Sequence, residues 1–138
     1  MQLNKNIYET EIQVRPDDID MFQHVHSSKY IDYVLAARYD QMERCYKMPM
    51  IEFLKNGFGW VINSTTINYK RALTIGDSLI VKTNLEEMAR TGCVVKFTIF
   101  IKSTGKISCD GVFHYTMINM QTARAETVPQ WIIDRYSI

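Results

Sequence analysis

The sequence has little excess charge, few cysteines and no long hydrophobic run, and each shortage narrows the possible functions. Its 16 Lys and Arg residues nearly balance 15 Asp and Glu residues, which gives a formal net charge of +1. No basic stripe is visible, so we expect no nucleic-acid partner and no general attraction to an anionic membrane surface. No apolar run approaches the roughly 20 residues that a membrane-spanning helix needs.

The three cysteines, Cys45, Cys93 and Cys109, are far apart and odd in number. Each lies within an apolar or mixed pattern, so we interpret them as free, buried thiols rather than as a disulfide framework. The first six residues lack the apolar segment that is typical of a signal peptide. Together these features predict a cytoplasmic protein.

What is present is the composition of an ordinary globular protein. Of the 138 residues, 46% are hydrophobic and 22% are charged, which suits one domain, residues 1–138, with a full-sized core. Strand-like patterns rich in β-branched and aromatic residues predict strands at 7–15, 60–69, 79–88, 94–102 and 107–117. Residues 28–48 instead carry apolar residues at helical spacing, among them Val34, Leu35 and Met42. Pro49 ends this helix, and shorter helices are expected at 50–56 and 129–136.

The order of one strand, a long helix and four strands predicts an α+β fold. Short connections with turn chemistry join the last three strands, which therefore form an antiparallel meander. Neither the long helix nor the sheet can bury its apolar face alone. We therefore predict a curved antiparallel five-stranded sheet wrapped around one long central helix, which is the hot-dog fold.

The loop before the long helix concentrates the ionisable residues, including Asp17, Asp18 and Asp20. A carboxylate beside a helix start has two interpretations. It can cap the free N–H groups of the first turn. Alternatively, it can activate water, or attack a carbonyl that those N–H groups polarise. The second arrangement is sufficient for acyl transfer to water.

The other polar residues of this loop also have more than one interpretation. Ser27 or Ser28 is a good N-cap, and without a GxSxG elbow neither is expected to be a nucleophile. His24 and His26 would lie on one side of an extended segment, where they form a possible metal pair with His114 or an aspartate. No HExxH or CxxC spacing supports a metal. We favour histidines that orient the loop or titrate beside the catalytic carboxylate, and we predict no metal.

Residues 18–30 resemble the active-site loop of the 4-hydroxybenzoyl-CoA thioesterase family of hot-dog acyl-CoA thioesterases. Asp18 and Asp20 match the family's Asp-x-Asp, and Tyr30 matches its tyrosine on the helix. His26-Ser27 stands where the plant-type acyl-carrier-protein thioesterase relatives usually have Asn-Asn. Residues 69–79 resemble the family's strand, Gly-Asp turn and next strand, so the resemblance covers nearly the whole chain.

The resemblance implies roles for the loop and for the helix start. Asp20 would be the nucleophile or general base, with His24 and His26 beside it. The backbone N–H near Ser27 would polarise the thioester carbonyl, and Tyr30 would contact the substrate.

The resemblance also implies a carrier and an assembly. Arg90 and Arg124 match the family's coenzyme A phosphate contacts, although each is equally well interpreted as a solvated surface arginine. The substrate would be an acyl-CoA or acyl-carrier-protein thioester, and no cofactor is implied. The chain would form a homodimer, or a tetramer of two dimers, by pairing strand 60–69 with its copy, which would also cover an apolar edge.

We thus expect an acyl-CoA thioesterase. A hot-dog hydratase or dehydratase is an alternative, in which His24 or His26 and Asp20 form an acid–base pair. A non-catalytic module that binds acyl thioesters is a second alternative. The candidates for an acyl pocket are Tyr33, Met42, Phe58 and Trp60, although residues of these types are more often plain core.

Overall fold

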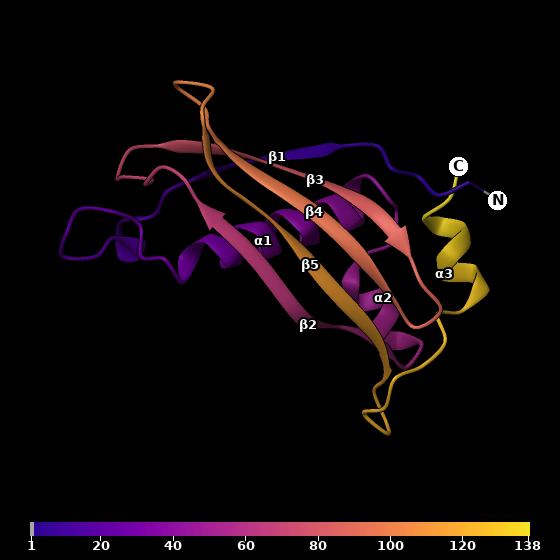
Figure 1. Ribbon diagram of the computed structural model, residues 1–138. Helices are drawn as coiled ribbons and strands as arrows, with labels where there is room; N and C mark the ends of the chain where they lie inside the picture. The colour runs from indigo at the N-terminus through magenta and orange to yellow at the C-terminus, as the bar shows by residue number, and fades with distance from the viewer. Residues whose placement is uncertain (1) are drawn as a thin grey trace.

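The computed structural model describes residues 2–138 and contains one five-stranded antiparallel sheet with a long helix against one face (Figure 1). The strands are β1 (Tyr8–Gln13), β2 (Phe58–Tyr69), β3 (Ser78–Met88), β4 (Gly92–Ile101) and β5 (Ile107–Asn119). The helices are α1 (Lys29–Arg44), α2 (Met50–Lys55) and α3 (Gln130–Arg135), and a 3-10 turn covers Pro16–Asp18. The predicted hot-dog architecture is confirmed.

The strand order in the sheet is β1-β3-β4-β5-β2, so the predicted meander of β3, β4 and β5 forms its centre. β1 and β2 are the two edges. β2 is the longer edge strand, with 12 residues, and it pairs only with β5. Gly111 of β5 permits this pairing, because a Cβ there would collide with the Thr66 carbonyl oxygen and with the Phe97 ring.

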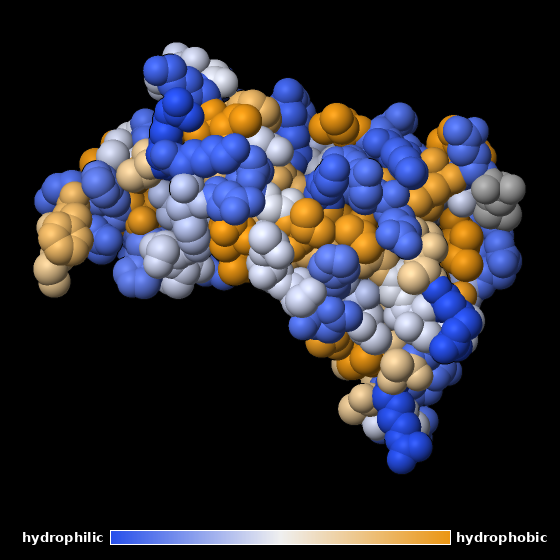
Figure 2. Space-filling model, viewed as in Figure 1, coloured by the Kyte–Doolittle hydropathy of each residue, from blue (hydrophilic) through white to orange (hydrophobic). Residues whose placement is uncertain are grey.

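The core lies between the sheet and α1, which passes behind the strands in Figure 1. The predicted alternation in β3 is confirmed, since Leu79, Val81 and Leu85 are fully buried. Figure 2 views the molecule from the same side as Figure 1 and shows hydrophilic residues interspersed with apolar patches over the outer face of the sheet. Burial of apolar side chains on one face only explains the alternating sequence pattern.

α1 differs from its prediction at its end and along its buried face. It ends at Arg44 rather than Met48, because Lys47 takes a left-handed conformation (φ 58°) and the Met48 N–H donates to the Met42 carbonyl (2.8 Å). Leu35, predicted in the apolar stripe, is 38% exposed. The polar residues Arg38 and Gln41 are buried in the helix instead.

The cysteines are free thiols, as predicted. Burial raises the pKa of both Cys93 and Cys109 to about 12, so neither forms a thiolate near neutral pH. Cys45 is only partly buried, because it caps the end of α1 rather than packing inside the core. No helix within residues 2–138 has the length and apolarity needed to cross a membrane.

Candidate active site

The loop between β1 and α1 is held in place by backbone hydrogen bonds within itself and to the segment that leads into β3. The Val25 N–H donates to the Leu73 carbonyl (2.8 Å), and the His26 N–H donates to the Asp18 carbonyl (2.9 Å). His24 pairs with Thr74 in an isolated antiparallel bridge. The loop is therefore an ordered part of the fold, built on the Gly-Asp turn region that the sequence placed before the third strand.

Asp20 is fixed by a turn that its own side chain closes. Its Oδ1 accepts the backbone N–H of Phe22 (2.8 Å) and that of His24 (3.4 Å). The turn needs a left-handed residue, and Gln23 supplies it at φ 68°. Within residues 2–138, Oδ2 of Asp20 accepts no hydrogen bond. One carboxylate oxygen thus holds the loop, and the other is available to a ligand.

The start of α1 is capped by an imidazole, not by a serine hydroxyl as the sequence predicted. Ser28 is the N-cap residue, but its side chain makes no capping hydrogen bond. The Ser28 N–H instead donates to Nδ1 of His26 (3.2 Å), and the Ser28 Oγ lies 2.8 Å from the same nitrogen. Because a backbone N–H can only donate, Nδ1 is an acceptor and the neutral ring carries its proton on Nε2.

The Ser27 peptide has an unused donor. From His24 to Lys29, within the described chain, every backbone N–H donates to a protein acceptor except that of Ser27. The Ser27 carbonyl accepts the Tyr69 hydroxyl at 2.9 Å, which fixes the orientation of the residue. A free N–H at the start of a helix is suited to a developing negative charge.

These groups line one open cavity of about 360 Å³. Its lining residues are Asp20, His24, Val25, His26, Ser27, Tyr30, Tyr69, Lys70, Arg71 and Ala72. All of the site residues predicted in the loop and on the helix therefore come together. Tyr30 itself is buried, and its hydroxyl accepts the Leu73 N–H (3.0 Å), so within this chain it supports the cavity wall.

Arg90 and Arg124 do not line this cavity. Both are exposed at the opposite end of the sheet, and Arg90 donates to the Thr127 hydroxyl (3.2 Å). The 11 residues of β3 separate the two regions, a span of about 33 Å. Within one chain, neither arginine reaches a substrate bound beside Asp20.

Three polar residues of the cavity were not assigned a role from the sequence: Tyr69, Lys70 and Arg71. Lys70 pairs with Asp110 (Nζ–Oδ2 3.0 Å), and Arg71 donates to the Ile107 carbonyl (3.1 Å), so both cations are held by β5. The sequence feature that could have identified them is a Tyr-Lys-Arg run at the end of an edge strand. This run meets the loop only in the folded protein, because the loop that it faces lies some 40 positions earlier in the chain.

Asp18 has a structural role, although its carboxylate does not cap the N–H groups of the first turn of α1. It is 2% exposed, and its Oδ2 accepts the Tyr33 hydroxyl at 2.7 Å. Burial acts to raise the pKa of Asp18, but hydrogen bonds from Tyr33 and Arg15 outweigh it and hold the pKa below its usual value. The contact ties the loop to α1.

We expect Asp18→Asn to lower the free energy of unfolding at pH 7 by about 2 kcal/mol, since the Tyr33 hydroxyl loses a charged acceptor. A folded-state pKa below the unfolded one means that the folded state binds fewer protons. The stabilisation is therefore present above the ordinary pKa and is lost as pH falls through the folded one. Urea unfolding at pH 7 and at about pH 3 checks this. An equal difference between wild type and variant at both pH values would contradict it.

We expect Tyr69→Phe to lower kcat for hydrolysis of acyl thioesters, the reaction expected from the sequence, about fivefold. One hydrogen bond that orients the Ser27 peptide is lost in this variant. The aromatic contact with Tyr30, with ring centroids 5.2 Å apart, is retained in the variant. Steady-state rates and melting temperature are measured together. A loss of stability without a loss of kcat would show that the hydroxyl only supports the fold.

The histidines are not assembled into a metal site. His114 lies in β5 and lines a different cavity from His24 and His26. Among residues 2–138 there is no group of three or more His, Cys, Asp or Glu side chains arranged to hold a metal ion.

A second cavity, of about 440 Å³, lies between α1 and β2. Of the four candidates for an acyl pocket, Met42 and Trp60 line it, whereas Tyr33 and Phe58 do not. Tyr33 instead holds Asp18, and Phe58 packs at the margin of the core.

The curved sheet around α1, with a carboxylate loop at the helix start, defines a protein of the hot-dog class. Within that class, the sequence model of the Thioesterase-like superfamily matches residues 14–135, and the chain belongs to this superfamily.

Three known proteins are similar to this chain. The long-chain acyl-CoA thioesterase FadM of Escherichia coli is 23% identical over 117 residues, which are 85% of this chain and 87% of that protein. The structure of a DHNA-CoA thioesterase from Staphylococcus aureus has a TM-score of 0.86 at 22% identity, covering 93% of this chain and 85% of that one. A second S. aureus protein, solved in complex with CoA, has a TM-score of 0.84 at 15% identity, covering 98% and 84%. The two structures share the fold.

Proposed function

We propose that the chain is an acyl-CoA thioesterase that hydrolyses its substrate in the Asp20 cavity. One observation carries the proposal: the same open cavity is lined by Asp20, whose Oδ2 accepts no hydrogen bond within residues 2–138, and by Ser27, whose N–H is unused there. Thioester hydrolysis needs both, because one group delivers or activates the attacking oxygen and the other stabilises the oxyanion. The activities named for FadM and for the DHNA-CoA thioesterase support the same reaction.

In the proposed reaction, the thioester carbonyl oxygen accepts the Ser27 N–H. As a general base, Asp20 takes a proton from water, and the hydroxide oxygen bonds to the carbonyl carbon. As a nucleophile, Asp20 itself bonds to that carbon, and water later cleaves the anhydride. In both cases the C–S bond breaks, the sulfur leaves as a thiolate that takes up a proton, and a carboxylate is released. Neither step calls for a metal or cofactor.

The two roles of Asp20 are separated by one turnover in H₂¹⁸O with enzyme in excess. A nucleophilic Asp20 whose anhydride is cleaved by water at the Asp20 carboxyl carbon leaves unlabelled oxygen in the first product and ¹⁸O in the enzyme. A general base, or an anhydride cleaved at the acyl carbon, places ¹⁸O in the product and leaves the enzyme unlabelled, so ¹⁸O in the enzyme is the result that identifies a nucleophile.

We further propose that the working unit is a dimer of single-domain chains joined through the β2 edges. β2 is an edge strand with exposed apolar side chains, Val61 at 42% and Tyr69 at 51% exposure, and pairing would cover them. The two-fold axis would bring Arg90 and Arg124 of one chain toward the Asp20 cavity of the other, where Lys70 and Arg71 already supply positive charge. The three free cysteines fit a reducing compartment, so we assign the enzyme to the cytoplasm.

The proposal is tested by thiol release from a panel of acyl-CoA and acyl-carrier-protein thioesters, with an enoyl-CoA included. We expect saturable release of thiol, with the carbon–carbon double bond of the enoyl group intact in the product. Hydration of the enoyl-CoA without hydrolysis would replace the thioesterase with a hydratase. Saturable binding without any turnover would make the chain a binding module.

A further inference from the structure

Arg38 is a buried cation with few partners. It is 6% exposed, and it donates one hydrogen bond, to the Thr83 hydroxyl of β3 (Nη1–Oγ1 3.2 Å). Its guanidinium also lies over the Tyr46 ring, 5.6 Å from the centroid. In the described part of the chain, no carboxylate pairs with it. Most of its five N–H donors therefore lack a protein acceptor.

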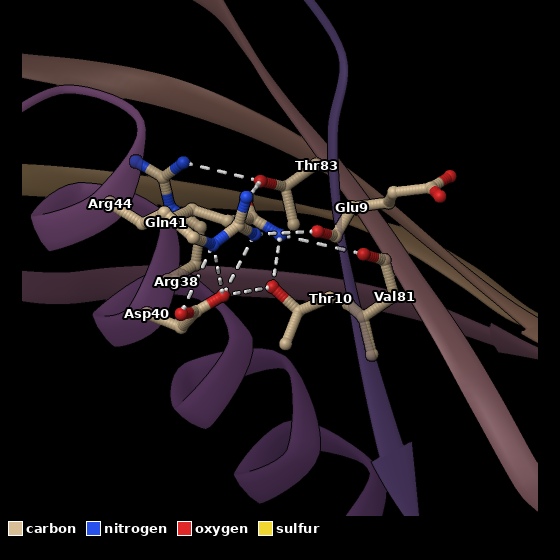
Figure 3. Close-up of polar contacts among 8 residues, drawn as sticks. All are labelled: Glu9, Thr10, Arg38, Asp40, Gln41, Arg44, Val81 and Thr83. Carbon is tan, nitrogen blue, oxygen red and sulfur yellow. Dashed lines mark hydrogen bonds and ion pairs between the residues drawn. The ribbon is translucent and has the colours of Figure 1, made fainter.

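Neighbouring polar groups do not supply the missing anion. Figure 3 shows Arg38 reaching Thr83, whereas Asp40 of the same helix faces Arg44 and Thr10. Asp40 is 2.9 Å from Arg44 and accepts the Thr10 hydroxyl at 2.6 Å. The Thr83 hydroxyl, in turn, donates to Gln41. The network thus fixes Arg38 in position without neutralising it.

Of residues 2–138, Arg38 is also the only charged one that lines the 440 Å³ cavity between α1 and β2. The remaining lining is apolar or aromatic: Leu35, Tyr39, Met42, Met50, Trp60, Val61, Ile62, Cys93, Tyr115 and Tyr136. The buried indole N–H of Trp60 has no acceptor within residues 2–138. A buried charge without a counter-ion is unfavourable, so the cavity is suited to a ligand that is apolar along its length and anionic at its end.

We propose that this cavity binds the far end of the acyl group, and that this end carries a carboxylate. The inference rests on the proposed thioesterase function and narrows its substrate class to ω-carboxyacyl thioesters. Arg38 lies eight positions along α1 from Tyr30, which lines the Asp20 cavity. That separation is about 12 Å along the helix axis, which an extended chain of about ten carbon atoms spans.

The test compares two substrates of the same chain length, decanedioyl-CoA and decanoyl-CoA. We expect the wild-type kcat/KM to be about thirtyfold higher for the first, because its carboxylate pairs with Arg38 in a water-poor cavity. Arg38→Met should remove this preference. Arg44→Met is the matched control, since Arg44 is an exposed arginine of the same helix that binds Asp40, and it should keep the preference.

A binding measurement separates this proposal from the proposed function. Decanedioate should raise the melting temperature of the wild-type protein and not that of Arg38→Met, whether or not any thioester is hydrolysed. Equal kcat/KM for the two substrates, or an equal loss for both in Arg38→Met, would overturn the inference while leaving a thioesterase. A melting shift without hydrolysis of either substrate would support the carboxylate site and contradict the thioesterase.

Discussion

Asp20→Asn is expected to lower kcat for acyl-CoA hydrolysis about a thousandfold, the scale of a lost general base or nucleophile. The fold should survive, because an Asn side chain still offers an Oδ1 that accepts the N–H groups of Phe22 and His24. Steady-state thiol release and thermal unfolding of the same sample measure both quantities.

Asp17→Asn is the matched control. Asp17 belongs to the same loop, but its side chain is 74% exposed and does not line the cavity. We expect its kcat to stay near that of wild type. If both variants lost activity equally, or if Asp20→Asn kept it, the carboxylate of Asp20 would not be part of the chemistry.

A mixture of two inactive or weakened chains is expected to recover activity. Arg90→Ala should reduce kcat/KM for acyl-CoA about tenfold through a lost phosphate contact. In a dimer that mixes Asp20→Asn with Arg90→Ala, one of the two sites combines an intact Asp20 with an intact Arg90. Random exchange of subunits should therefore restore about a quarter of wild-type activity at low substrate.

The measurement is kcat/KM before and after the two variants are mixed and allowed to exchange. A mixture that gives only the average of its parents would show that Arg90 does not serve the partner's site. Sedimentation velocity on the same samples reports whether dimers are present, so a failure of pairing is distinguished from a failure of Arg90.

The fold was predictable because most of its information is local. The period of β3 and β4 and the turn chemistry between strands each depend on neighbouring residues. The buried face of α1 was harder. Arg38 and Gln41 occupy positions of the buried face, but their polar side chains give no sign of burial in the sequence. They are buried because Thr83 supplies polar partners inside the sheet.

For the site, too, only the part formed by neighbouring residues could be predicted from the sequence. Asp20, Ser27 and the two loop histidines, His24 and His26, lie within a few positions of one another. A local motif was therefore enough to predict that they meet. Lys70 and Arg71 join the cavity only because residues 73–74 pair with the loop, and that pairing is long-range. The predicted contribution of Arg90 and Arg124 depends on a second chain.

The most direct test of the account is a crystal structure of the protein with a non-hydrolysable acyl-CoA analogue. We predict that the carbonyl oxygen of the analogue accepts the Ser27 N–H, that Asp20 Oδ2 faces the carbonyl carbon, and that two chains meet along β2. An analogue whose carbonyl lies away from Ser27 and Asp20 would contradict the assignment of this cavity as the active site.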